Sequence, residues 1–180
     1  MARNLNIKMK KIILLLIGGL LLTSCVDKKK EGVETSEESK VVTYNYSVVF
    51  DAIYKKEDSI KVYYKLNGYF NYDNPVVAKI NGSDSIQKIK IDMPAEIAVE
   101  NFSIVASTNK DQNTLVIRNI SVERNNKIIF DGSEYKYNDY FLSDKSFSWD
   151  DKNQRFNLNH SNKYPPGIIG NDKLEGLMFN

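Results

Sequence analysis

Apolar and polar residues alternate through most of the chain after residue 40. Apolar side chains occupy every second position in residues 41–50, and the same spacing returns in residues 59–66 and 98–107. Because successive side chains of a β-strand point to opposite faces, this spacing predicts strands with one buried face. The predicted core positions are Val42, Tyr44, Tyr46, Val48, Phe50, Ile60, Val62, Tyr64, Leu66, Phe102, Ile104 and Ala106.

One long segment, residues 114–123 (TLVIRNISVE), keeps this alternation but shifts its phase. Its apolar positions are Leu115 and Ile117, then Ile120 and Val122, so the spacing slips by one residue at Arg118-Asn119. An extra residue in one strand of a pair is a β-bulge, which bends the strand and re-aims its side chains. The sequence therefore predicts a bulge here.

Several shorter apolar stretches complete the pattern. They are residues 75–80, 85–92, 127–130, 146–149 and 154–158, with turn signals at Asn81-Gly82, Asn125-Asn126 and Asp131-Gly132. No stretch keeps a helical period over three turns, and one or two turns are expected within residues 133–142. About nine short strands separated by turns predict an all-β fold, a two-sheet antiparallel β-sandwich over residues 41–160. Residues 161–180 do not look like a strand, and we expect an extension that docks on the domain.

Residues 98–141 resemble a known type of sandwich. The order is NFSIVAS, a polar loop, TLVIRNISVERNNKIIFDG and an aromatic segment with Tyr140-Phe141. This order is similar to the late strands of jelly-roll domains of the galactose-binding or carbohydrate-binding type. The resemblance is one of apolar spacing over about 100 residues. It implies a jelly-roll-like sandwich that binds sugars, binds proteins or supports its neighbours, and the fold alone does not choose among these.

The first 24 residues have the layout of a secretory signal. Lys8, Lys10 and Lys11 precede residues 12–22, an unbroken apolar run of eleven residues. A membrane-spanning helix needs about 20 apolar residues to cross a core of roughly 30 Å. The run is too short for that, and its basic start is typical of a cleaved signal peptide.

The apolar run leads to the only cysteine of the chain, in the sequence Leu22-Thr23-Ser24-Cys25. This sequence resembles the lipobox of bacterial lipoproteins: an aliphatic residue, two small residues and cysteine. The resemblance implies that Cys25 receives a diacylglycerol thioether, that the leader is cut before it, and that the lipid holds the protein at a membrane. Because Val26 follows, it also implies the outer membrane of a Gram-negative cell envelope, on either face. The alternative is an ordinary signal peptide with a cysteine nearby by chance.

Residues 25–40 connect the lipidation site to the predicted domain. After Cys25 this segment has no aromatic residue and only two valines, so it cannot bury enough apolar surface to offset the entropy of ordering. We expect a flexible tether. Four of the 25 basic residues and no acidic residue lie before the apolar run, which leaves 21 basic and 23 acidic residues after it. This balance leaves no basic patch, and we predict no nucleic-acid partner.

The residues that carry most enzyme chemistry are scarce. One cysteine and one histidine, His160, provide no disulfide framework, no CxxC metal site and no readable Ser/His/Asp set. Carboxylate chemistry on a glycan is the remaining enzyme alternative, and it needs two acids across a cleft. We predict no enzyme and no cofactor. A structural calcium ion at residues 71–74 or 81–84, which are rich in Asp and Asn, is left open, although neither loop matches a twelve-residue calcium loop.

Aromatic side chains are the better candidates for ligand contacts. Tyr63 is predicted on the opposite face from the core residue Tyr64, Tyr69 and Tyr72 are expected in a loop, and Trp149 belongs to a later aromatic cluster. A flat exposed ring can stack on the apolar face of a pyranose, although many rings in any domain are packing residues. We therefore predict a lipid-anchored, non-catalytic binding module of the cell envelope, with a glycan as ligand. The alternative is a structural or accessory lipoprotein that docks on another envelope protein through an exposed apolar patch.

Overall fold

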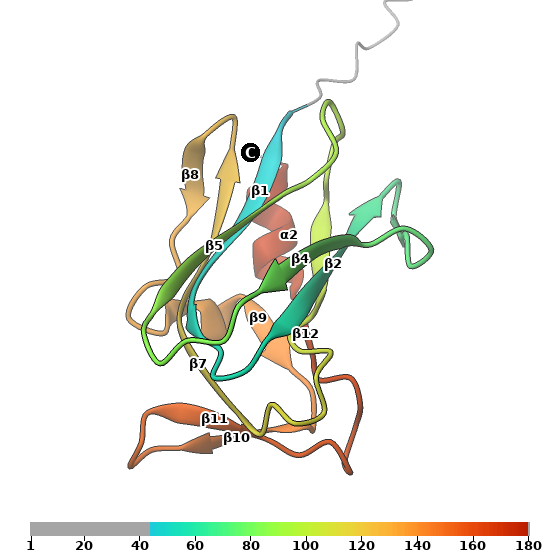
Figure 1. The fold of residues 1–180 in the computed structure, drawn as a ribbon. Coiled ribbons are helices and arrows are strands. Elements are labelled where there is room, and N and C mark those ends of the chain that lie inside the picture. Colours follow the sequence, from blue (N-terminus) through green and yellow to red (C-terminus); the bar gives the residue numbers. More distant parts are fainter. Residues whose placement is uncertain (1–43, 180) are drawn as a thin grey trace, which may run out of the picture. The chain divides into compact units, whose positions relative to one another are not determined.

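The structure, a computed structural model, describes residues 44–179, which form an antiparallel β-sandwich (Figure 1). The predicted signal peptide, Cys25 and the tether lie outside these residues. Each of the two sheets has six strands. The expected all-β sandwich is confirmed, with twelve strands where about nine were expected.

The first sheet, called here the β1 sheet, has the order β10-β11-β7-β1-β5, and β8 also pairs with β7. Its strands are β1 (Tyr46–Ile53), β5 (Gln87–Asp92), β7 (Thr114–Arg124), β8 (Lys127–Phe130), β10 (Phe147–Asp150) and β11 (Arg155–Leu158). The second, the β2 sheet, has the order β3-β2-β6-β12-β9, with β4 also on β2. Its strands are β2 (Asp58–Leu66), β3 (Tyr69–Phe70), β4 (Val76–Ile80), β6 (Asn101–Val105), β9 (Phe141–Ser143) and β12 (Gly167–Gly170).

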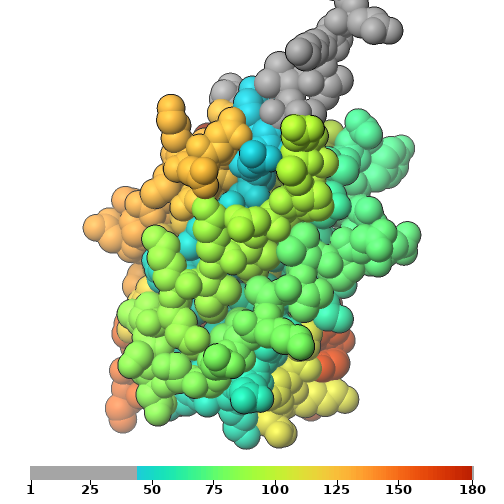
Figure 2. Space-filling view, turned by 45° about the horizontal axis from the view of Figure 1, so that its top comes forward, coloured from blue at the N-terminus to red at the C-terminus, as the bar shows by residue number. Residues whose placement is uncertain are grey.

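The chain passes repeatedly from one sheet to the other. The strands β1, β5 and β7 lie in the β1 sheet, while β2, β4 and β6 lie in the β2 sheet. Asn81-Gly82, where the sequence predicted a turn, is therefore part of a crossing between β4 and β5. Gly82 approaches the backbone of Lys55 closely there, since an added Cβ would lie 2.9 Å from the Lys55 carbonyl oxygen. In the space-filling view, β4 and β5 lie side by side and cover one side of the sandwich (Figure 2).

The core lies between the inner faces of the two sheets, where the alternating pattern placed it. Among the predicted positions in the described part of the chain, Tyr44 and Leu66 are partly buried against the core and the others are buried. The fully buried ones include Val48, Phe50, Ile60, Val62 and Phe102. Tyr54 joins them, and its hydroxyl donates to the Ala106 carbonyl oxygen at 2.7 Å.

The predicted bulge in the longest strand, β7, is confirmed. Asp51 of β1 pairs with Asn119, but the next residue, Ala52, pairs with Ile117, which leaves Arg118 as the extra residue. Leu115 and Ile117 before the bulge, and Ile120 and Val122 after it, are all buried.

One short segment differs from the sequence-based expectation, and another agrees with it. Residues 67–73, expected as a loop around Tyr69, begin with a tight turn at Asn67-Gly68, where φ is 51° and 82°, and continue into β3. Left-handed residues at both central positions match the right-handed twist of a hairpin. The η1 3-10 helix (Lys136–Asp139) supplies the helical turn that was expected within residues 133–142.

The expectation that residues 161–180 contain no strand is wrong. The strand β12 pairs with β6 on one side and β9 on the other, so it lies inside the β2 sheet. Its four residues, GIIG, are too short to show alternation, although Ile168 is buried and Ile169 is exposed. At its end, a Cβ added to Gly170 would collide with the side-chain ends of Asn101 and Leu174, so both of these buried side chains would have to shift.

The chain continues from β12 into the α2 helix (Asp172–Met178), which packs against β6 and β12. The Asn171 side chain caps its first turn by accepting from the backbone N–H groups of Lys173 and Leu174, and Leu174 and Met178 point into the core. Glu175 accepts from Lys65 Nζ at 2.6 Å and from Asn101 Nδ2 at 3.0 Å. Within residues 44–179, no helix is long and apolar enough to cross a bilayer.

Gly132 and Gly176 offer a matched pair for testing close packing. A Cβ added at Gly132 would collide with the Ile120 carbonyl oxygen and lie 2.7 Å from Tyr137 Cβ, whereas one added at Gly176 meets no atom within 4 Å. We expect Gly132→Ala to lower the free energy of unfolding by about 1–3 kcal/mol. Gly176→Ala, in a helix, is expected to raise it by roughly 0.5–1 kcal/mol. Urea unfolding measures both, and equal effects of the two variants would contradict the close approach at Gly132.

The contact between α2 and the β2 sheet predicts a pH dependence of stability. The hydrogen bond from Lys65, helped by Asn101, lowers the pKa of Glu175. A carboxyl group with a lowered pKa in the folded state stabilises that state above its unfolded pKa of about 4.3 and loses the effect as pH falls through the folded value. We expect Glu175→Gln to lower the free energy of unfolding at pH 7, and the difference from the unaltered chain to shrink towards pH 3. Glu134→Gln, which alters an exposed pair with Lys136, is the control with no expected change.

Candidate functional site

The four aromatic residues predicted to contact a ligand lie in two different places. Tyr63 and Tyr72 lie together in the β2 sheet region, with ring centroids 5.1 Å apart. Tyr69, on β3, is 81% exposed, and within the described chain its ring contacts no other aromatic ring. Trp149 lies on β10 of the β1 sheet and lines a pocket that contains none of the other three.

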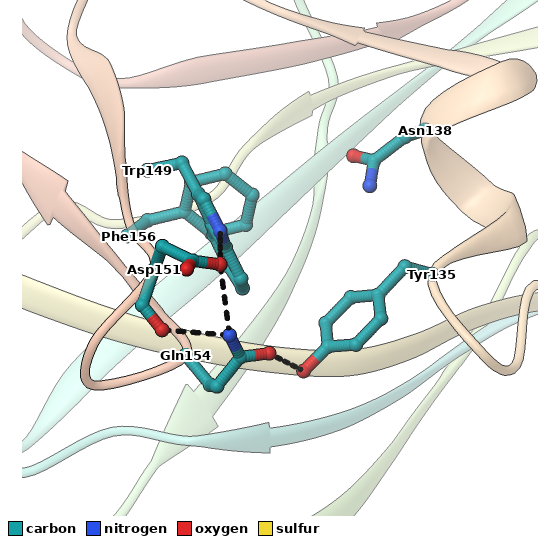
Figure 3. A pocket seen from close by; sticks show the side chains of 6 residues that line it. All are labelled: Tyr135, Asn138, Trp149, Asp151, Gln154 and Phe156. Carbon is teal, nitrogen blue, oxygen red and sulfur yellow. Dashed lines mark hydrogen bonds between the residues drawn. The ribbon is translucent and has the colours of Figure 1, made fainter.

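This pocket, called here the Trp149 pocket, combines rings with polar side chains (Figure 3). Its volume is about 460 Å³. It is lined by Tyr135, Asn138, Trp149, Asp151, Gln154 and Phe156. Tyr135 and Asn138 come from the segment around η1, and the other four come from the β10–β11 hairpin opposite. The volume of the Trp149 pocket falls within the range of small-molecule sites, roughly 300–1,000 Å³.

The hairpin wall of the pocket is held together by aromatic packing. Trp149 pairs across the two strands with Phe156, and their ring centroids lie 5.0 Å apart. Phe147 contacts Phe156 edge-to-face from the other side, at 5.5 Å. Phe156 is buried and fixes the position of Trp149, which remains 42% exposed. The indole therefore presents an open surface on a supported base.

The turn of the same hairpin is fixed by polar contacts. Asp150 accepts from Asn153 Nδ2 at 2.7 Å and from Arg155 Nε at 3.3 Å. The hydrogen bonds from Asn153, together with Arg155, lower the pKa of Asp150. Gln154 follows with φ at 50°, a left-handed conformation that non-glycine residues seldom adopt. This turn carries Asp151 and Gln154 to the edge of the pocket.

The opposite wall begins at the end of β8. Asp131 accepts from the Ser133 backbone N–H at 3.1 Å and from Asn119 Nδ2 at 3.2 Å, and the bond from Ser133 is the main cause of the lowered pKa of Asp131. Glu134 and Tyr135 then take φ values of 56° and 63°. Strained conformations of this kind persist where the surrounding contacts fix them, and they cluster at functional sites.

Tyr135 is positioned by contacts on two sides. Below it, Tyr137 is buried, its hydroxyl donates to the Ile117 carbonyl oxygen at 3.1 Å, and burial raises its pKa. Beside it, Arg118 Nη1 donates to the Tyr135 hydroxyl, and the guanidinium carbon lies 5.9 Å from the ring centroid. Arg118 is the extra residue of the β7 bulge, so the bulge places the cation that holds this ring.

A short hydrogen-bond chain joins the two walls. The Tyr135 hydroxyl donates to Gln154 Oε1 at 3.4 Å, and Gln154 Nε2 donates to Asp151 Oδ1 at 3.1 Å. Asp151 Oδ1 also accepts from Trp149 Nε1 at 3.4 Å. The side-chain amide of Asn138 has no partner within the described residues and faces the pocket (Figure 3). The pocket therefore offers ring surface, one amide and one carboxylate to a ligand.

The outer face of the β2 sheet forms a second, shallower surface, called here the β2-sheet face. Cross-strand pairing places Tyr63, Ser103, Ile169 and Leu142 in one row across the sheet. A hollow of about 250 Å³ lies over part of this row, bordered by Tyr72, which is 57% exposed. The charged groups at its rim, Asp144 and Lys163, bond to each other at 2.9 Å. The two charged side chains that line this hollow are therefore paired with each other.

Neither Asx-rich loop offers a ready cage of metal ligands. Within residues 44–179, no three Asp, Glu, His or Cys side chains come together as candidate metal ligands. In residues 71–74 the Asn71 side chain accepts from the Asp73 backbone N–H, and in residues 81–84 the Ser83 hydroxyl accepts from the Ser85 N–H. A calcium ion there, which would also use backbone oxygens, stays an untested prediction.

Sequence reasoning identified one of the six residues that line the Trp149 pocket. Tyr135 lies in the same aromatic-rich part of the sequence as Trp149, and Asp151 follows Asp150, but neither pattern shows that Tyr135 and Asp151 lie together. The phase slip at Arg118 predicted the bulge, and the structure shows that the bulged residue bonds Tyr135. Nothing in the sequence indicates that Asn138 and Gln154 line a pocket, because they belong to two separate elements, a helical turn and a hairpin, that meet only in the folded domain.

Comparisons with protein-family models, with curated proteins and with solved structures find no match. The functional interpretation therefore depends on the chemistry of the residues themselves.

Proposed function

We propose that this protein is a lipid-anchored, non-catalytic binding module of a bacterial cell envelope, and that the Trp149 pocket binds a glycan. The observation that carries the proposal is the convergence of three aromatic rings with the Asn138 amide and the Asp151 carboxylate around one pocket of about 460 Å³. A sugar ring has apolar C–H faces and a rim of hydroxyl groups. Ring surface stabilises the first, and amide and carboxylate groups hydrogen-bond the second.

A binding role is supported by the acid content of the pocket. Hydrolysis of a glycosidic bond needs two carboxyl groups, about 5–9.5 Å apart, on either side of the scissile bond. Asp151 is the one carboxylate that lines the Trp149 pocket. The neighbouring Asp150 is engaged with Asn153 and Arg155. We therefore propose recognition without bond cleavage.

The cell-envelope location in this proposal depends on the first 25 residues of the sequence, with the lipobox-like Leu22-Thr23-Ser24-Cys25. A single acyl chain gives only marginal membrane binding, while two or more chains on one residue anchor a protein stably. A lipid on Cys25 is thus sufficient to hold the sandwich at a membrane, and the outer membrane is the proposed site.

A second candidate function, docking on another envelope protein, is favoured by the β2-sheet face. Leu142 and Ile169 are exposed side by side there, and Tyr72 lies at the border of the same hollow. Exposed apolar patches of several hundred Å² often mark protein interfaces. The two functions use different surfaces, so variants on each surface separate them.

The glycan proposal predicts the effect of removing one ring. We expect the full chain in mild detergent to be retarded in affinity electrophoresis by at least one of a panel of bacterial and plant polysaccharides. Trp149→Ala is expected to weaken that binding about tenfold or more, since an aromatic ring supplies most of the apolar contact. Phe179→Ala, which removes a ring that is 69% exposed at the end of α2, is the matched control with no expected change.

Two results would contradict the proposal. Retardation by no polysaccharide would remove glycan binding as the function. Loss of binding in Tyr72→Ala, with Trp149→Ala unaffected, would show that the ligand occupies the β2-sheet face.

Lipidation predicts a specific change when the sulfur is removed. We expect the chain from bacterial membranes to enter the detergent phase of a Triton X-114 separation, and Cys25→Ser to stay in the aqueous phase. Mass spectrometry of the processed N-terminal peptide is expected to show a diacylglycerol thioether on Cys25. An unmodified thiol in the native material would contradict the anchor and leave glycan binding as a separate question.

A further inference from the structure

The Trp149 pocket has unequal capacity for hydrogen-bond donors and acceptors from a ligand. Asp151 Oδ1 already accepts from Trp149 Nε1 and Gln154 Nε2, while Oδ2 of the same carboxylate has no partner in the described chain. An ionised carboxylate can only accept hydrogen bonds. The Asn138 amide can both donate and accept. A ligand must therefore bring a donor to Asp151, such as a hydroxyl or an amide N–H.

The charge of the pocket disfavours a negatively charged ligand. Asp151 is the one charged side chain among the six that line it. Arg118 is directed to the Tyr135 hydroxyl and ring and does not line the pocket. Near the rim, Arg155 pairs with Asp150 and Lys136 pairs with Glu134, while Lys152, the exposed neighbour of Asp151 in the turn, does not line the pocket. A carboxylate on the ligand would meet a like charge, with no basic side chain in the lining to compensate.

We infer that Asp151 sets the specificity of the pocket, which takes neutral sugars and rejects the corresponding uronic acids. This inference rests on the proposed glycan function and names the class of glycan. Discrimination of this kind operates by repelling the wrong ligand as well as by bonding the right one. A primary hydroxyl donates to Asp151 Oδ2, while a carboxylate in its place cannot donate and repels it.

The test uses two forms of one glycan that differ only at C6, where a hydroxyl donor is replaced by a carboxylate. The neutral ligand is a β-glucan, mannan or chitin oligosaccharide that the full-length protein binds. It is compared with the same oligosaccharide after oxidation at C6 to the uronate. We expect the neutral form to bind the unaltered protein at least tenfold more tightly at low salt, measured by titration calorimetry. In Asp151→Asn, which keeps the shape and removes the charge, we expect the preference to fall to about threefold or less. Asp139→Asn removes a charge from η1 outside the pocket lining and is expected to keep the preference.

Each result has a distinct meaning. Equal or tighter binding of the oxidised form by the unaltered protein overturns the inference but leaves glycan binding intact. An unchanged preference in Asp151→Asn overturns the role of Asp151. Binding of neither form of any polymer by the unaltered protein removes the proposed function and this inference together. Added salt is expected to reduce the preference, because the carboxylate is exposed to solvent.

Discussion

The β-bulge at Arg118 is the constraint on which the candidate site depends. The strand β7 has eleven residues and pairs with β1, β8 and β11, so it must keep apolar side chains on the core along its whole length. The extra residue allows this while turning two consecutive polar side chains, Arg118 and Asn119, away from the core. Arg118 bonds the Tyr135 hydroxyl, and Asn119 bonds Asp131. The bulge therefore fixes two parts of the η1 wall of the pocket: its first residue, Asp131, and the Tyr135 ring.

The two walls of the Trp149 pocket are stabilised in different ways. The hairpin wall depends on packing, with Phe156 buried between Phe147 and Trp149. The η1 wall depends on hydrogen bonds, and it holds Glu134 and Tyr135 in left-handed conformations. Backbone strain of about 1–3 kcal/mol per residue is tolerated only where neighbouring contacts over-determine the conformation. Glycine at position 132 contributes here, because no side chain fits between the Ile120 carbonyl group and Tyr137.

Much of the fold was predictable from the sequence because strand alternation reports burial directly. The inner faces of β1, β2, β6 and β7 were predicted residue by residue, and so was the bulge. The strand β12 was missed, since four residues with glycine at both ends show no period, and its place depends on β6 and β9, which flank it. The Trp149 pocket was found only in part for the same reason. Tertiary contacts join residues 118, 135, 149 and 154, and spacing along the chain does not encode them.

The position at which the chain enters the sandwich has a consequence for ligand binding at the Trp149 pocket. At its first residue, Tyr46, β1 pairs with Arg124, while its last residue, Ile53, pairs with Val116, next to Leu115, which pairs with Phe156 of the pocket. The start of β1 and the β10–β11 hairpin therefore lie towards opposite ends of the domain (Figure 1), and the eight residues of β1 span about 23 Å at roughly 3.3 Å per step. The entry of the chain and the pocket therefore use opposite ends of β1, so a ligand bound beside Trp149 leaves the start of that strand uncovered.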